Sequence, residues 1–217
     1  MSFFDKGKLI FSLVGIATLL SCNSSVETTP DHTVQIRTLI DSTRVIIEKH
    51  KLEWGLLFLD ASLSKITNLS IDDKLRIYNF KQRYHYWAGR DALIAKYLNK
   101  SIAYSDTIIN LIKANKVEDK YKTQLGDAFF NKGDVFLIQK KYEDCYRNYH
   151  LGKQLVNKKG TACENARFNS RLAYLNYIQG NYKLSASLYM QEYRDNFKCT
   201  LDNKIFGDIP AALNNAG

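Results

Sequence analysis

A helical pattern that proline hardly interrupts constrains the fold of this chain more than any other feature of its sequence. Proline lacks a backbone donor and breaks helices, and only 2 of the 217 residues are proline. Ile36, Ile40 and Ile47 fall on one face of a helix, and no segment shows the sustained two-residue alternation of a strand. The sequence therefore predicts an all-α chain of about eight or nine helices joined by short turns.

Short signals place the start of one helix and the face of another. Ser70 is followed three residues later by Asp73, which resembles a capping box with aspartate in the glutamate position. Gly89 interrupts the helical segment that follows. Earlier in the chain an apolar stripe at helical spacing predicts a further helix, and it consists of Trp54, Leu57, Phe58 and Ala61.

Two stretches in the second half of the chain match each other at an offset of 40 residues. Small residues align with small ones and aromatic residues with aromatic ones: Gly133 with Ala173, Tyr142 with Tyr182, Cys145 with Ser185, and Tyr149 with Tyr189. This pattern resembles the tetratricopeptide repeat (TPR), a pair of antiparallel helices. The resemblance covers residues 125–217, and a less regular copy precedes it around Gln82 and Gly89. Lys140 and Lys141 depart from the usual Gly-Asp/Asn turn, and the period is longer than the usual 34 residues.

The resemblance implies a fold and a binding surface. It implies antiparallel helix pairs stacked as a TPR-like right-handed α-solenoid over residues 33–217, in which the last repeat, ending in "AALNNAG", is incomplete. In this family the first helices of successive repeats line a concave groove that binds a peptide or a protein. The residues at the matching groove positions are Arg76, Asn79, Arg83 and Tyr86 in the first copy, Asp127, Phe130, Asp134 and Leu137 in the second, and Arg167, Ser170, Tyr174 and Tyr177 in the third.

The N-terminal segment has the order of features of a secretory signal. Lys6 and Lys8 precede an apolar run of about a dozen residues, whereas a membrane span takes ~20 residues. The run ends in "LLSC" at Cys22, which resembles the lipobox of bacterial lipoproteins. That resemblance implies cleavage before Cys22 and lipidation of Cys22, so that residues 1–21 are a lipoprotein signal peptide and residues 22–32 a flexible tether. A plain cleaved signal and an uncleaved anchor are the alternatives.

The charge and the histidines do not indicate a nucleic-acid site, a metal site or an enzyme. The formal net charge is +9, but the lysines are scattered, and the sequence has no zinc-finger spacing or RNP-like aromatic cluster. The four histidines show no metal-ligand spacing, and His85 lies among aromatic residues, which favours a place in the core. We therefore expect no catalytic residue, no metal, no cofactor and no nucleic-acid partner.

The cysteines are interpreted as unpaired. If Cys22 carries a lipid, three of the four cysteines remain, and an odd number argues against a disulfide framework. They form no CxxC pair, and their spacing fits no metal site. Cys145 is expected to pack as a small apolar residue.

These patterns together predict a lipid-anchored scaffold in the bacterial cell envelope, outside the cytoplasm, which binds a peptide or protein partner in a TPR-like groove. One alternative is the extracytoplasmic sensor input region of a longer TPR-containing histidine kinase or transcriptional regulator, which the unfinished last repeat favours. A glycan-binding uptake lipoprotein is a further alternative. The identity of the partner, the choice between inner and outer membrane, and the oligomeric state are left open by the sequence.

Overall fold

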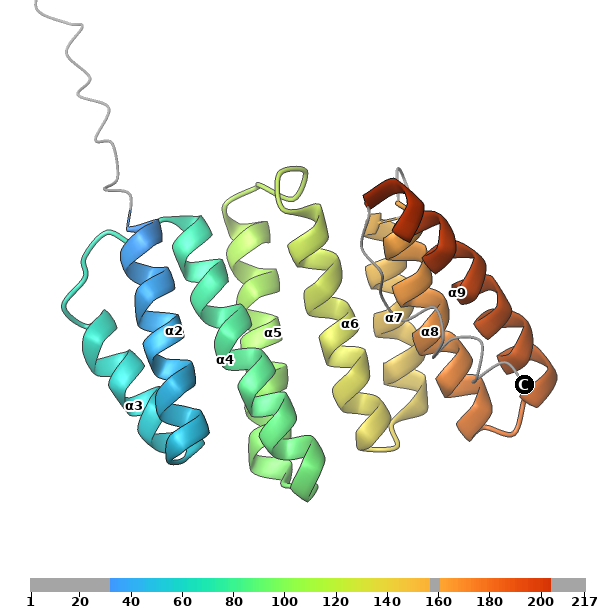
Figure 1. Ribbon diagram of the computed structural model, residues 1–217, viewed down its shortest axis with the longest axis horizontal. Coiled ribbons are helices and arrows are strands. Elements are labelled where there is room, and N and C mark those ends of the chain that lie inside the picture. Colours follow the sequence, from blue (N-terminus) through green and yellow to red (C-terminus); the bar gives the residue numbers. More distant parts are fainter. Residues whose placement is uncertain (1–31, 157–160, 204–217) are drawn as a thin grey trace, which may run out of the picture.

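The computed structural model describes residues 32–156 and 161–203, and within these ranges the chain forms eight α-helices and no strand (Figure 1). The helices are α2 (Thr33–Lys49), α3 (Leu52–Leu63), α4 (Ile71–Ala92), α5 (Ala95–Ala114), α6 (Lys122–Ile138), α7 (Tyr142–Val156), α8 (Ala162–Ile178) and α9 (Tyr182–Asn203). The prediction of an all-α chain is confirmed. Cys22, the signal peptide, almost all of the predicted tether and the segment predicted as an unfinished repeat lie outside the described residues.

The helices begin and end where local backbone chemistry favours it. At the start of α4 the Ser70 hydroxyl accepts a hydrogen bond from the Asp73 backbone N–H at 3.1 Å, so the predicted start is confirmed. Thr161 and Glu164 form a complete capping box at the start of α8. The turns after α6 and α8 contain Lys140 and Gly180, both in the left-handed region with φ of 58° and 78°. Lys140 therefore adopts the backbone conformation that favours glycine at the matching position.

The described helices pack as consecutive pairs, and these pairs follow one another in a row (Figure 1). The most extensive packing joins α4 to α5, α6 to α7, and α8 to α9, and α2 packs on α3 about as extensively as α5 packs on α6 between neighbouring pairs. The first helices of neighbouring pairs also touch. Helix α2 packs on α4, and α4 packs on α6, where the Asn131 amide donates a hydrogen bond to the Gln82 side chain at 3.0 Å. The handedness and the solenoid character of this row stay predictions.

Small residues allow the two helices of a pair to approach each other closely. A Cβ atom added to Gly133 in α6 would lie only 2.4 Å from the Tyr149 ring of α7. Ala173 in α8 is fully buried, and its carbonyl accepts a hydrogen bond from the Ser185 hydroxyl of α9 at 2.9 Å. Cys145 is also fully buried. Residues that the 40-residue offset aligns thus form close contacts within the last two pairs, α6 with α7 and α8 with α9.

One buried histidine lies in the middle of the row. The His85 side chain in α4 is almost fully buried between the rings of Tyr97 and Tyr104, and its Nδ1 lies 2.7 Å from the Lys81 carbonyl oxygen. The prediction that His85 is a core residue is confirmed. Burial lowers the pKa of His85 below its ordinary value of 6.5, an effect that outweighs the hydrogen bond to Lys81.

The lowered pKa predicts that acid destabilises the fold through His85. The unfolded chain binds a proton near pH 6.5, whereas the folded chain resists protonation of His85. This part of the stability is present above pH 6.5 and is lost as the pH falls towards the lower folded pKa. In urea unfolding at pH 7.5 and pH 5.5, His85→Gln should lose less stability on acidification than the parent chain. His50→Gln, at the exposed end of α2, should keep the parental dependence, and an unchanged dependence in His85→Gln would contradict the assignment.

A disulfide corrects the interpretation of the cysteines. Cys163 of α8 and Cys199 of α9 are bonded, with Cα atoms 4.9 Å apart, so the prediction that the cysteines are unpaired is wrong. Three cysteines besides Cys22 can form one disulfide and leave one free thiol. Among the described residues the free thiol belongs to Cys145. Burial raises the pKa of Cys145 to about 12, so this side chain stays a protonated packing group, as the sequence predicts.

Candidate functional site

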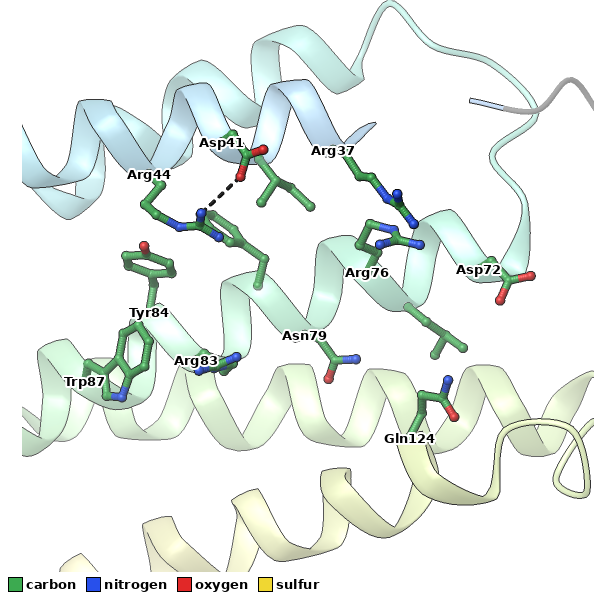
Figure 2. Close-up of a pocket in the computed structure, with 13 residues that line it drawn as sticks. Arg37, Asp41, Arg44, Asp72, Arg76, Asn79, Arg83, Tyr84, Trp87 and Gln124 are labelled. Atoms are coloured by element: carbon green, nitrogen blue, oxygen red, sulfur yellow. Dashed lines mark hydrogen bonds and ion pairs between the residues drawn. The ribbon is translucent and has the colours of Figure 1, made fainter. Parts of the chain in front are cut away.

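A pocket of about 750 Å³ lies between the first helices of the first two pairs (Figure 2). Helices α2 and α4 supply most of its lining, and Gln124 of α6 completes it. Ile40, Leu75 and Phe80 contribute an apolar floor, because all three are buried core residues that also border the pocket. The pocket therefore combines a fixed apolar base with polar side chains that reach in from two helices.

Aromatic rings form one wall of the pocket along α4. The ring of Phe80 lies 4.5 Å from that of Tyr84, which in turn meets the Trp87 ring edge-on at 5.2 Å. Such contacts hold the rings in fixed positions relative to one another. The Arg83 guanidinium lies 5.0 Å from the centre of the Trp87 ring, a cation–π contact that orients the guanidinium without neutralising it.

Cations outnumber anions among the lining residues. The pocket holds four arginines against two aspartates, and both aspartates are already engaged. Asp41 forms an ion pair with Arg44 at 3.0 Å, as Figure 2 shows, and Asp72 forms one at 3.3 Å with a lysine that does not line the pocket, Lys120.

Three arginines of the pocket have no carboxylate partner in the part of the chain that the structure describes. Within the described ranges no ion pair involves Arg37, Arg76 or Arg83. The Nε atom of Arg76 is buried and lacks a hydrogen-bond partner among the described residues. Figure 2 shows Arg37 and Arg76 extending from their two helices towards the same end of the pocket. Two guanidinium groups that converge in this way attract an anion, which each can bind through two parallel hydrogen bonds.

The arginines form two matching rows. Arg37 and Arg44 are seven residues apart on α2, and Arg76 and Arg83 are seven residues apart on α4. Seven residues correspond to about 10 Å along a helix. The pocket can therefore offer cationic groups at two places about 10 Å apart, with apolar and aromatic surface between them.

The structure brings three of the predicted groove residues together in this pocket. Arg76, Asn79 and Arg83 all line it. Tyr86, the fourth residue predicted on α4, does not line it but packs under the Arg90 guanidinium at 5.8 Å. Burial, followed by the nearby Asp134 carboxylate, raises the pKa of Tyr86, so its hydroxyl stays neutral.

The charged groove residues of α6 and α8 neutralise each other. Asp127 forms an ion pair with Arg167 at 2.9 Å. The Asp134 carboxylate receives two hydrogen bonds from Arg171, both 2.9 Å long, and one from the Tyr149 hydroxyl at 2.8 Å. These groups hold α6 against α8. Their charges are already balanced, so they attract a charged ligand less than Arg37, Arg76 and Arg83 do.

The remaining predicted groove residues take different places. Phe130 is only 2% exposed and packs on Tyr149 and Phe168, so its assignment to the groove is corrected: the ring belongs to the core. Leu137 packs partly buried against the same cluster. Ser170 is half-buried, whereas Tyr174 and Tyr177 are exposed on α8.

Sequence reasoning missed Arg37, Arg44, Tyr84 and Trp87. A signal for the two arginines exists, because shifting α2 by 39 residues places Arg37 on Arg76 and Arg44 on Arg83. The same shift places Thr43 on Gln82, and both are buried. Helix α2 thus carries the same pattern as α4. An offset of 40 residues does not reveal this match, because the two helices align at 39.

Other kinds of site find no support in the part of the chain that the structure describes. Within it, no three histidine, cysteine or acidic side chains gather in a way that could hold a metal ion. Nor does any of its helices have the length and apolar character that crossing a membrane requires. Comparison of the chain with family models, with curated proteins and with solved structures gave no match.

Proposed function

We propose that this protein is a lipid-anchored extracytoplasmic scaffold of TPR-like repeats, and that the pocket between α2 and α4 binds an acidic segment of a peptide or protein partner. The observation that carries the proposal is a set of three arginines, Arg37, Arg76 and Arg83, that have no carboxylate partner among the described residues and lie above an apolar and aromatic floor. Arginine and aromatic side chains are the groups that contribute most at binding surfaces.

The contrast within the row of first helices supports this choice of site. Arg167 and Arg171 each hold an aspartate of α6, so the charge there is used to join helices. No ion pair in the described residues neutralises Arg37 or Arg76. The Arg76 Nε atom is buried without a hydrogen-bond partner among these residues, which is unfavourable for a charged group. An incoming carboxylate would supply the missing acceptors.

The buried positions support the repeat. Offsets of 39, 51 and 40 residues align Thr43, Gln82, Gly133 and Ala173, and all four are buried at the contact within their pair of helices. A TPR-like array needs small or internally bonded residues at this place, because the two helices approach closely there. Gln82, the largest of the four, donates its amide to the buried Ser101 hydroxyl at 2.9 Å.

The disulfide supports placement outside the cytoplasm. Disulfides persist in oxidising compartments and are rare in the cytosol, and the Cys163–Cys199 bond lies in a part of the chain unrelated to the predicted signal peptide. Two independent features therefore favour the same compartment.

The pocket should distinguish an acidic peptide from its neutral counterpart. An extended chain covers about 3.4 Å per residue, so glutamates three residues apart match the spacing of about 10 Å between the two arginines of each row. A fluorescein-labelled peptide with two such glutamates and leucines between them should bind more tightly than the same peptide with glutamines. Arg76→Glu combined with Arg83→Glu should weaken binding at least tenfold, on the order of one charged hydrogen bond or more, measured by fluorescence anisotropy.

The control is Arg90→Glu, which reverses one arginine charge on α4 outside the pocket. It should leave the anisotropy titration unchanged, and circular dichroism should show equal helicity in all variants. Equal binding of the glutamate and glutamine peptides, or equal weakening by Arg90→Glu, would contradict the proposed site.

A further inference from the structure

An apolar stripe of α3 faces away from the core. The helix buries Gly55 and Leu59, whereas Trp54 and Leu57 are 66% and 65% exposed. Phe58 and Ala61 are exposed on the same face. The stripe predicted from the sequence exists, but it is the outer face of the helix. A helix that is apolar on both faces normally has a second apolar environment to occupy.

The position of α3 leaves this face open. The helix lies at one end of the row and packs mainly against α2 (Figure 1). The two helices are antiparallel neighbours joined by a short turn. No other helix of the described residues packs on the outer stripe.

The charges around the stripe are asymmetric. Lys51 lies one turn before Trp54, and Lys65 lies one turn after Ala61, both exposed and without an ion pair among the described residues. The two acidic residues of α3 are engaged by neighbouring helices instead. Glu53 accepts a hydrogen bond from the Tyr97 hydroxyl of α5, and Asp60 forms an ion pair with Lys81 of α4. The outer face therefore presents apolar side chains between two cations.

We propose that the outer face of α3 lies in the interfacial region of an anionic lipid bilayer. Tryptophan favours the boundary between acyl chains and headgroups, leucine and phenylalanine favour the acyl side, and lysines at the rim attract anionic headgroups. The proposal rests on the lipid anchor of the proposed function. From Cys22 to Thr33 the chain has eleven steps and cannot span more than about 40 Å, so a lipidated Cys22 keeps this end of the row close to the membrane.

A second copy of the chain fits this face less well. A stable protein interface takes about 800 Å² from each partner, far more than four side chains on a helix of 12 residues present. Two copies meeting through this stripe would also bring Lys51 and Lys65 of both copies together, without acids to balance them. A bilayer surface with anionic lipids provides both the apolar and the negative partner.

The test uses the two tryptophans of the chain, Trp54 and Trp87. The full, lipidated protein is reconstituted in vesicles of phosphatidylethanolamine and phosphatidylglycerol with brominated acyl chains. With Trp87→Phe, Trp54 is the sole tryptophan, and its emission should be quenched and shifted to shorter wavelength. With Trp54→Phe, the remaining Trp87 of the pocket should not be quenched. Leu57→Ser with Phe58→Ser should reduce Trp54 quenching to the level of the Trp87 control, while Val34→Ser with Val45→Ser, which changes exposed apolar residues of α2, should not.

The outcomes separate this inference from the anchor. Palmitate labelling at Cys22 together with unquenched Trp54 would overturn the membrane contact of α3 and leave the anchor intact. If no label is incorporated, the anchor proposal fails, and quenching of Trp54 by vesicles added to the same chain still decides about the α3 face. A dimer in sedimentation without lipid, with Trp54 emission already at short wavelength, would overturn the inference in favour of a second copy.

Discussion

Replacing Asp134 by alanine is expected to lower the free energy of unfolding by about 3 kcal/mol, the range for breaking a buried ion pair. The Asp134 and Arg171 side chains are only 17% and 20% exposed, and the carboxylate accepts hydrogen bonds from Arg171 and from the Tyr149 hydroxyl. Without it, the Arg171 cation stays between α6 and α8 with no acid to balance it, and Tyr149 loses its acceptor. Urea unfolding followed by circular dichroism measures the loss.

Asp127→Ala is the matched control for this prediction. Its ion pair with Arg167 joins the same two helices at 2.9 Å, but the Arg167 side chain is 48% exposed, so the loss should be below about 1 kcal/mol. Asp134→Ala combined with Arg171→Met should recover part of the stability, because no buried charge is then left unpaired. Equal losses in the two aspartate variants would show that burial of the pair is not what matters.

Removing the disulfide is expected to lower the free energy of unfolding by about 2–4 kcal/mol, the usual range for a loop of this size. The bond joins positions 36 residues apart and holds α9 against α8 at one end of the row. In the variant with Cys163→Ser and Cys199→Ser, amide hydrogens of α9 should exchange faster. Those of α4 and α5 should change little, because α9 packs mainly on α8.

The reductant provides the internal control for this second prediction. A phosphine reductant should destabilise the parent chain and leave the double serine variant unaffected. Mass spectrometry of the parent chain, with and without reduction before thiol alkylation under denaturing conditions, should show two further alkylation sites after reduction. A parent chain whose stability and alkylation do not respond to reduction would rule out the bond.

The sequence predicted the parts of the fold that depend on local chemistry. Helical periodicity, the Ser70 cap and the aligned small residues such as Gly133 are local or pairwise patterns, and the structure contains all of them. The orientation of α3 was not readable in this way. Its stripe from Trp54 to Ala61 has the spacing of a core face, yet the close approach of Gly55 to α2, where an added Cβ would lie 2.3 Å from Ile47, turns the stripe outward.

The site was predicted only where the charged groove residues form no ion pair with another described residue. Arg76, Asn79 and Arg83 line the pocket as predicted. The sequence does not reveal that Asp134 of α6 pairs with Arg171 of α8, in the neighbouring pair of helices, or that Phe130 lies in the core. Such contacts depend on how neighbouring pairs are stacked. The disulfide was missed for a different reason, since counting cysteines says nothing about which two lie within bonding distance.

The covalent link between α8 and α9 makes the two ends of the row unequal. The Cys163–Cys199 bond links the helices at one end of the row covalently. At the other end, no covalent bond among the described residues links α2 and α3, which are held by packing and by the contacts of Glu53 with Tyr97 and of Asp60 with Lys81, so fraying should begin there. Arg37 belongs to that weaker end, and Arg76 belongs to its neighbour. A partner that binds both arginines would therefore reversibly stabilise α2 against α4. Resistance of α2 to proteolysis would then measure how much of the pocket is occupied.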